Sequence, residues 1–137
     1  MSWVAKYIGI RFVDHGRSEA GVDCWGLVRL VYHNERGIWL PTFVDSYTDT
    51  SSGAEIRSLL DANLRRPWEE VTAAEAEEFD LVLFALPGGE WHLGLVVEPR
   101  RGIMLHAQRP QDTVTERYRE PRWRNVLDSV WHLGAAA

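Results

Sequence analysis

The sequence contains few residues that form covalent crosslinks. Cys24 is the one cysteine among 137 residues, which excludes an intramolecular disulfide and a multi-thiolate metal site made by one chain. The fold therefore does not depend on an oxidising compartment. We expect that the protein requires neither a metal nor an organic cofactor.

Long apolar runs and a positive charge balance are also missing. No run approaches the roughly 20 apolar residues of a membrane span, and the first residues lack the basic-then-apolar layout of a secretory signal. The formal net charge is −5, which argues against binding nucleic acid or anionic lipid through bulk electrostatics. We expect no membrane span and no nucleic-acid partner. A substrate outside the cytoplasm would require a route other than general secretion.

The chain does contain enough apolar residues for one core. The apolar fraction is 45% and the charged fraction 26%, both normal for a globular protein. The length fits a single domain spanning residues 1–137. Tryptophan is abundant, with seven residues, and these rings need a core or a partner surface to cover them.

Hydrophobic patterning predicts helices first and strands later. A helix is expected at about 24–36, with Asp23 as its N-cap and Gly37 as its C-terminal stop. The next predicted elements are a loop over 38–54, a second helix near 54–64 and a short helical or irregular connector over 67–78. Strands are predicted over 81–86, 92–97, 102–107, 112–117 and 125–132, as a meander. This order is typical of an α+β fold.

Cys24 would lie in the first turn of the predicted helix. Free backbone N–H groups and the positive end of the helix dipole favour a thiolate there. A thiolate is the nucleophile that cysteine hydrolases use. The alternative is that this cysteine is a small buried apolar residue with no chemical role.

Two histidines lie in neighbouring predicted strands. A hairpin centred on Pro99 sets His92 opposite His106, with Cβ atoms roughly 5 Å apart. One imidazole would then act as a base while the other orients its ring. The alternatives are two polar side chains on a solvated face or half of a metal site, and a slip of one residue would send the rings to opposite faces. His15 precedes Cys24 and would border a cleft or be an ordinary loop residue, and no role is expected for His33 or His132.

Four blocks of the sequence resemble those of NlpC-type cell-wall peptidases, in the same order. Residues 23–28 (Asp-Cys-Trp-Gly-Leu-Val) resemble the block around the nucleophile. Residues 79–84 (Phe-Asp-Leu-Val-Leu-Phe) are similar to the strand that precedes the catalytic histidine. Residues 92–96 (His-Leu-Gly-Leu-Val) resemble the block that carries this histidine, and residues 105–107 (Leu-His-Ala) resemble the segment with the third, orienting residue.

The resemblance implies a papain-like α+β fold, with N-terminal helices packed on a central antiparallel β-sheet. It also implies a cysteine peptidase with a triad of Cys24 as nucleophile, His92 as base and His106 as orienting residue. The substrate would be peptidoglycan, cut at a stem-peptide amide bond after D-glutamate. Further candidates for the substrate and oxyanion site are Phe12, His15, Asp23 and Trp25.

Two segments resemble the branch of this family found in tailed phages, prophages and gene transfer agents. They are residues 7–16 (Tyr-Ile-Gly-Ile-Arg-Phe-Val-Asp-His-Gly) and 37–41 (Gly-Ile-Trp-Leu-Pro), together with the Trp that follows the cysteine. The branch implies tail-hub or tail-tip proteins as partners. The protein would be made in the host cytoplasm, carried at the tail tip of the virion, and act on the periplasmic cell wall.

The sequence departs from the family pattern at two positions. Phe12 stands where many members have a tyrosine that helps to shape the oxyanion site, and Phe79 stands where the family has glycine. The backbone N–H of Cys24 remains available to an oxyanion.

Two rival functions stay open. One is a structural tail-tip or plug protein. The other is a different thioester chemistry on the same fold, either hydrolysis of lipid amides or acyl transfer, which would require a wide apolar cleft. Candidates for binding stem-peptide carboxylates are Arg11, Arg17 and Arg109.

Overall fold

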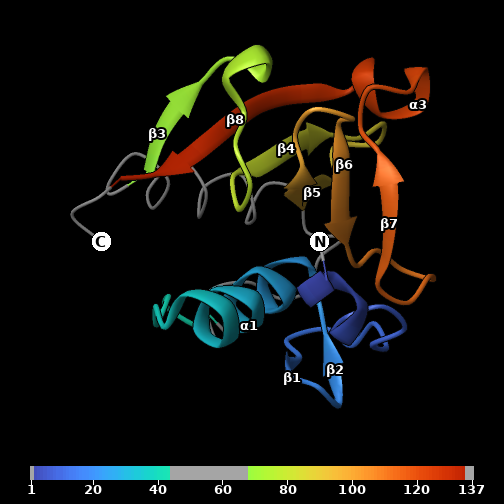
Figure 1. Cartoon of the computed structure of the whole chain (residues 1–137). Helices are drawn as coiled ribbons and strands as arrows, with labels where there is room; N and C mark the ends of the chain where they lie inside the picture. Colours follow the sequence, from blue (N-terminus) through green and yellow to red (C-terminus); the bar gives the residue numbers. More distant parts are fainter. Residues whose placement is uncertain (1, 44–67, 135–137) are drawn as a thin grey trace.

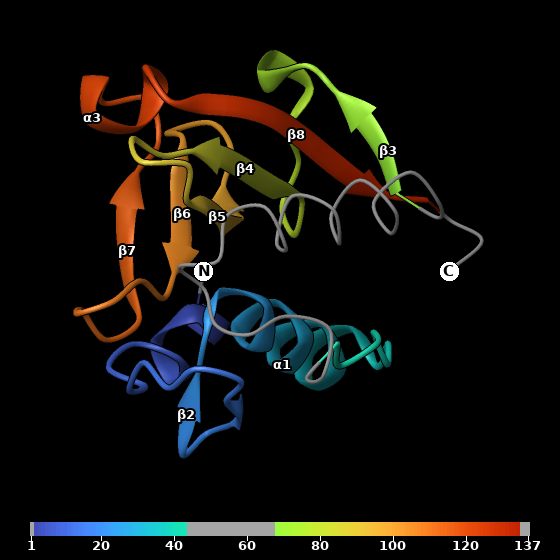
Figure 2. The same cartoon turned by 180° about the vertical axis from the view of Figure 1, so that it is seen from behind.

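The computed structural model describes residues 2–43 and 68–134. Figure 1 shows two layers, with the N-terminal elements below a twisted sheet, and Figure 2 shows the same layers from behind. The elements are η1 (Ser2–Lys6), β1 (Arg17–Ser18), β2 (Gly21–Val22), α1 (Cys24–Arg36), β3 (Trp68–Val71), η2 (Ala73–Glu75), β4 (Leu81–Ala85), β5 (Trp91–Glu98), β6 (Ile103–His106), β7 (Val114–Arg117), α3 (Pro121–Arg124) and β8 (Leu127–Leu133). The predicted α+β architecture, with a helix packed on an antiparallel sheet, is confirmed. Among the described residues, no helix combines the length and apolar character that crossing a membrane demands.

Helix α1 has the bounds that its capping residues predict. The Asp23 carboxylate accepts a 2.8 Å hydrogen bond from the Gly26 N–H at the first turn. At the other end, Gly37 has φ 65°, and its N–H donates to the carbonyls of Tyr32 and His33. These local signals fix both ends of the helix, because each satisfies backbone groups that the helix itself leaves unpaired.

The sheet has the strand order β3-β8-β4-β5-β6-β7. Strands β4 to β7 form the predicted meander, but β8 returns to lie between β3 and β4. The helical or irregular connector predicted over 67–78 is therefore wrong in part, since Trp68–Val71 pairs with β8 as an edge strand. Residues 38–43 have no helix or strand, as expected. The rest of the predicted loop and the second helix near 54–64 lie outside the described residues.

The hairpin of β5 and β6 is displaced from its predicted register by two residues. Leu95 lies opposite Leu105 and Val96 opposite Met104, with an irregularity between Val96 and Glu98. A tight turn that ends at Gly102, with φ 67°, sets this register. Because side chains alternate with a period of two, a displacement of two residues keeps each of them on its predicted face.

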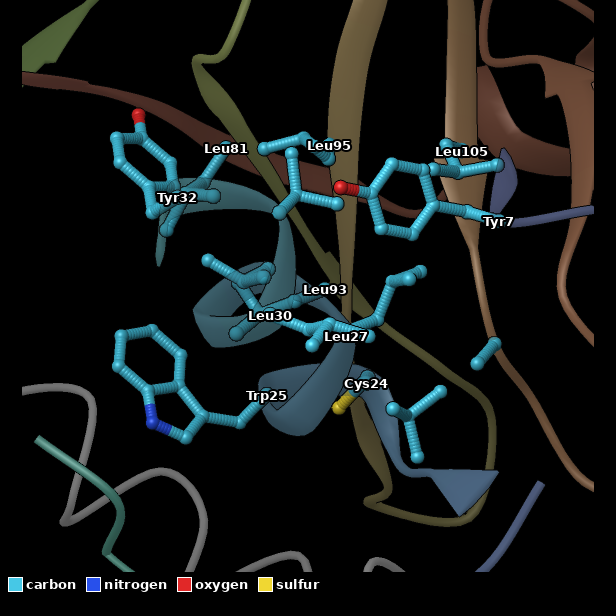
Figure 3. Packing of buried hydrophobic residues seen from close by; sticks show 14 of the residues in the cluster. Tyr7, Cys24, Trp25, Leu27, Leu30, Tyr32, Leu81, Leu93, Leu95 and Leu105 are labelled. Carbon is cyan, nitrogen blue, oxygen red and sulfur yellow. The ribbon is translucent and has the colours of Figure 1, made fainter. Parts of the chain in front are cut away.

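Alternate residues of the strands build two separate clusters. The cluster between the sheet and α1 is shown in Figure 3 and includes Tyr7, Cys24, Leu27, Leu81, Leu93, Leu95 and Leu105. The cluster on the opposite face of the sheet consists of Val82, Phe84, Val96, Met104, Tyr118, Trp123 and Val130. Each large apolar side chain buried in these layers contributes about 1.5–3 kcal/mol of transfer free energy. The sheet is therefore covered on both faces where β5 begins, which is the region that carries His92.

Candidate active site

Cys24 begins α1 and is almost completely buried. Its exposed fraction is 6%, and it belongs to the cluster between α1 and the sheet. Burial and, to a smaller extent, the Asp23 charge raise the pKa of the Cys24 thiol to about 12, although the backbone N–H groups of Leu93 and Trp25 oppose the shift. The expectation of a thiolate at the helix start is therefore wrong for this state, because the loss of solvation outweighs the helix terminus.

The two imidazoles of the predicted triad are in direct contact. His92 is the second residue of β5 and His106 is the last residue of β6. The Nε2 of His92 lies 2.8 Å from the Nδ1 of His106. Both residues are buried, with exposed fractions of 3% and 1%. The pair forms although the register prediction was displaced, because both rings stay on one face of the sheet.

Aromatic rings enclose the histidine pair. The His92 ring stacks against Trp123 at 5.6 Å between centroids and against Phe84 at 6.2 Å. Trp123 also meets the His106 ring edge-on at 5.2 Å. Burial lowers the pKa of His92 well below its usual value, and His106 adds to this effect. Burial also lowers the pKa of His106, although the Glu116 carboxylate opposes the shift. Both rings are therefore neutral near pH 7.

Glu116 is a site residue that the sequence analysis missed. Its Oε2 lies 2.6 Å from the Nε2 of His106, and its Oε1 accepts hydrogen bonds from Arg122 and from the Trp123 indole N–H. The strand over 112–117 was predicted, but the register that aligns β7 with β6 was not, and this register decides which side chain reaches His106. In the part of the chain that the structure describes, no group of three or more His, Cys, Asp or Glu side chains could hold a metal ion.

Cys24 is linked to this pair through the backbone of β5 and not through a side-chain hydrogen bond between the described residues. The His92 ring contacts residues of the cluster on the far face of the sheet, whereas Cys24 packs with Leu93 on the α1 face. Between the described residues, no hydrogen bond joins Cys24 to either imidazole. The connection is through β5, since the backbone N–H of Leu93 interacts with the Cys24 sulfur and Leu93 is the next residue after His92. The triad of Cys24, His92 and His106 stays a prediction.

Asp23 and Arg17 hold the loop before α1 in place. The Asp23 carboxylate is fully buried and accepts hydrogen bonds from the backbone N–H of His15 at 3.0 Å and from Arg17 at 2.8 Å. Arg17 also donates to the carbonyls of Gly16 and Thr42, and its side chain is only 10% exposed. Arg17 is therefore a structural cation, and the idea that it binds stem-peptide carboxylates is not supported by these contacts.

The remaining candidates lie in the loop before α1, in the first turn of α1 or in the loop after β6, and their substrate roles stay predictions. Phe12 is half-buried beside Val22, and the Arg109 guanidinium lies 5.4 Å from its ring centroid. Arg109 also forms an ion pair with Asp14. Trp25 is buried against Phe43, and its indole N–H donates to the Pro41 carbonyl. Arg11 is exposed.

His132 and Phe79 have more defined environments than the sequence indicated. His132 Nδ1 lies 2.6 Å from Oδ1 of Asp80, which is buried just before β4. Phe79 has φ 75°, a left-handed conformation that side chains with a Cβ rarely adopt. This conformation gives a physical reason for the glycine that the resembling family has at that position. The ring of Phe79 stacks on Trp3 at 5.0 Å.

A sequence profile of the NlpC/P60 family matches residues 9–132. This chain belongs to the NlpC/P60 family. The family is one of cysteine peptidases and related hydrolases. A search of curated protein sequences finds no significant match. The phage-associated branch is not distinguished by this match, so that placement stays a prediction.

Several solved NlpC/P60 structures share the fold. The NlpC/p60 domain of the peptidoglycan hydrolase SagA is 20% identical, with a TM-score of 0.66 over 96% of this chain and 93% of that domain. A Staphylococcus aureus protein described as similar to lipoprotein is 23% identical, with a TM-score of 0.66 over 97% of this chain and 39% of its own. A Bacillus cereus NlpC/P60 protein is 18% identical, with a TM-score of 0.68 over 96% and 38%. This NlpC/P60 chain thus spans less than half of the latter two structures.

Proposed function

We propose that this NlpC/P60 chain is a cysteine peptidase that hydrolyses stem-peptide amide bonds of peptidoglycan. The family membership supports a cysteine hydrolase, and the likeness to SagA adds a relative that acts on this polymer. The single observation that carries the assignment of residues is the hydrogen bond between His92 and His106. His92 directly precedes Leu93, whose backbone N–H interacts with the Cys24 sulfur. We assign Cys24 as nucleophile, His92 as base and His106 as the residue that orients His92.

The proposed reaction proceeds through a thioester. The Cys24 S–H proton passes to Nδ1 of His92 as the sulfur attacks the amide carbonyl carbon, and the carbonyl oxygen takes the negative charge. When the tetrahedral intermediate collapses, the C–N bond breaks and His92 returns the proton to the leaving amine. Water then attacks the thioester, His92 takes its proton, and Cys24 leaves as a thiol when His92 protonates the sulfur. The backbone N–H of Cys24 is the donor that we assign to the oxyanion.

The electrostatics of the site favour a concerted first step over a resting ion pair. Burial raises the pKa of Cys24 and lowers that of His92, so both groups are neutral before substrate binds. Proton transfer and attack then occur together, because neither charged partner is stable alone in this environment. The step requires Nδ1 of His92 to come within reach of the Cys24 sulfur, to which it is not hydrogen-bonded in this structure, and within residues 2–43 and 68–134 that nitrogen has no hydrogen-bond partner.

The assignment is tested by turnover of purified peptidoglycan. We expect Cys24→Ala and His92→Ala to reduce the release of soluble fragments by about 10³-fold or more, as in other hydrolases that lose their nucleophile or base. His33→Ala is the matched control for loss of an imidazole, because His33 lies on α1 against Trp39 and away from the pair. Equal turnover by the wild type and Cys24→Ala would disprove the function.

The scissile bond that we propose follows D-glutamate. Cleavage there leaves a disaccharide dipeptide that ends in D-glutamate and exposes a new amine on the third residue of the stem. Mass spectrometry of the released fragments distinguishes this product from cleavage elsewhere in the stem or in the cross-bridge. Fragments with a different new terminus would reject this bond while leaving the peptidase function intact.

We further propose that the protein is made in the host cytoplasm, is carried at the tail tip of a phage-like particle, contacts tail-hub or tail-tip proteins, and opens the periplasmic wall. This rests on the resemblance of residues 7–16 and 37–41 to that branch. A mainly structural tail-tip role is the second candidate, and the buried neutral thiol of Cys24 favours it. Particles carrying Cys24→Ala that assemble but do not cross intact wall would support the enzyme, whereas failure to assemble would support the structural role.

A further inference from the structure

We propose that Glu116 is a positioning residue that fixes the tautomer of both histidines and leaves Nδ1 of His92 as the unprotonated nitrogen. This inference rests on the proposed function, because an unprotonated Nδ1 is what the base of that reaction needs. It extends the site by one residue beyond the three that the sequence indicated.

The first link is the contact of Glu116 with His106. An ionised carboxylate only accepts hydrogen bonds, and Oε2 of Glu116 lies 2.6 Å from Nε2 of His106. The other oxygen, Oε1, accepts from the Arg122 guanidinium at 3.1 Å and from the Trp123 indole N–H at 3.3 Å. With Oε1 accepting from these two donors, Oε2 is the oxygen that accepts from His106. The proton shared between Glu116 and His106 therefore belongs to Nε2 of His106.

The second link transfers this choice to His92. A neutral imidazole carries one N–H and one acceptor nitrogen. With the proton of His106 on Nε2, its Nδ1 is an acceptor, and the 2.8 Å contact with Nε2 of His92 requires that nitrogen to be the donor. The proton of His92 is then on Nε2, and its Nδ1 is free to take a proton from Cys24. Both rings are neutral because burial lowers the pKa of each.

Without the Glu116 carboxylate, the hydrogen bond between His106 and His92 could have the opposite donor and acceptor. His106 could then hold its proton on Nδ1 and donate to Nε2 of His92. The His92 proton would move to Nδ1, where it blocks the base. The same heavy-atom distances accommodate both directions, so the rings alone do not choose between them. Glu116 is the group that breaks this symmetry.

Trp123 contacts His92, His106 and Glu116 and holds the three side chains in position. Its ring packs against both imidazoles, and its N–H donates to Glu116. Glu116 belongs to β7, and Trp123 belongs to α3, which begins four residues after β7 ends. Figure 1 shows β7 and α3 together at one end of the sheet. The positioning device is thus built from the last third of the chain, far in sequence from the nucleophile.

The direct test is the tautomeric state of the histidines in the whole protein labelled with [15N]histidine. Two-bond proton–nitrogen correlation spectra at pH 7.5 identify which ring nitrogen carries hydrogen. In the wild type we expect Nε2–H on both His92 and His106. In Glu116→Gln, whose amide can donate as well as accept, we expect a mixture of both tautomers on each ring. Glu120→Gln is the matched control, since Glu120 is an exposed carboxylate near the same site and should leave the spectra unchanged.

A kinetic measurement separates positioning from a purely structural effect. With a soluble stem-peptide fragment as substrate, we expect Glu116→Gln to lower kcat about 10- to 100-fold with KM nearly unchanged, whereas Glu120→Gln keeps both values. Nδ1–H on His92 in the wild type, or identical tautomers in the wild type and Glu116→Gln, would overturn the inference. The wild-type spectrum decides by itself if Glu116→Gln does not fold. The spectra do not need catalysis, so a failed peptidase assignment from Cys24→Ala would be recognised separately.

Discussion

Two opposing influences act on the protonation of the Cys24 side chain. Its place at the start of α1 exposes it to backbone N–H groups, but burial and the Asp23 charge raise its pKa to about 12. We expect iodoacetamide to label Cys24 slowly at pH 7 and the rate to rise about tenfold per pH unit up to pH 9, because the thiolate is the reactive form. The same measurement in denaturant gives the rate of the accessible thiol. Fast labelling that is independent of pH between 6 and 9 would contradict this account.

Asp23 offers a way to change that pKa without removing the helix cap. In Asp23→Asn the amide oxygen still accepts from the Gly26 N–H, while the negative charge that raises the Cys24 pKa is lost. We expect a lower Cys24 pKa and faster labelling at pH 8 than in the wild type. Stability should fall by about 1–3 kcal/mol, since the buried Arg17 loses its charged partner. Asp14→Asn is the matched control, and equal labelling rates in the two variants would contradict the prediction.

Helix α1 ends at Gly37 because this residue adopts the left-handed conformation. Gly37 has φ 65°, and a Cβ built there meets no atom within 4 Å, so a substitution adds backbone strain without a clash. We expect Gly37→Ala to lower the free energy of unfolding by about 1 kcal/mol. Gly37→Asn should have a smaller effect, because asparagine tolerates the left-handed conformation better. Urea unfolding of both variants measures this, and an alanine variant as stable as the wild type would refute it.

The elements differ in how far local sequence predicts them. The bounds of α1 follow from Asp23 and Gly37, because capping is a contact between neighbours in the chain. The strand at Trp68–Val71 was not predicted, since it exists only through pairing with β8, which is about 60 residues later. The register of β5 and β6 was displaced by two residues for a similar reason, because the turn rather than the strand pattern sets it.

The contact between His132 and Asp80 affects the stability of the whole molecule, since it joins the central strands β8 and β4. Asp80 raises the pKa of His132, so the protonated histidine is favoured in the folded state. The resulting stability is fully present below the unfolded pKa of about 6.5 and is lost as pH rises through the higher folded pKa. Burial also raises the pKa of Asp80, so His132 offsets only part of the cost of burying this carboxylate.

We therefore expect His132→Asn to destabilise the protein more at pH 6 than at pH 9. The difference should be about 1 kcal/mol or less, because the His132 side chain is 38% exposed and solvent screens the pair. Urea unfolding of the wild type and the variant at both pH values measures it. Asp80→Asn should remove the same pH-dependent component, and a larger effect of His132→Asn at pH 9 would contradict the sign.

The sequence by itself determined α1 with its caps, the strand segments that carry His92 and His106, and the blocks that identify the NlpC/P60 family, because these features depend on neighbours in the chain and on period-two alternation. Only the tertiary structure decided that Glu116 and Trp123 complete the histidine pair, that Cys24 is buried and neutral, and that β8 lies inside the sheet. These outcomes depend on register between strands and on loss of solvation. Both arise from contacts between residues far apart in the sequence, which no local pattern encodes.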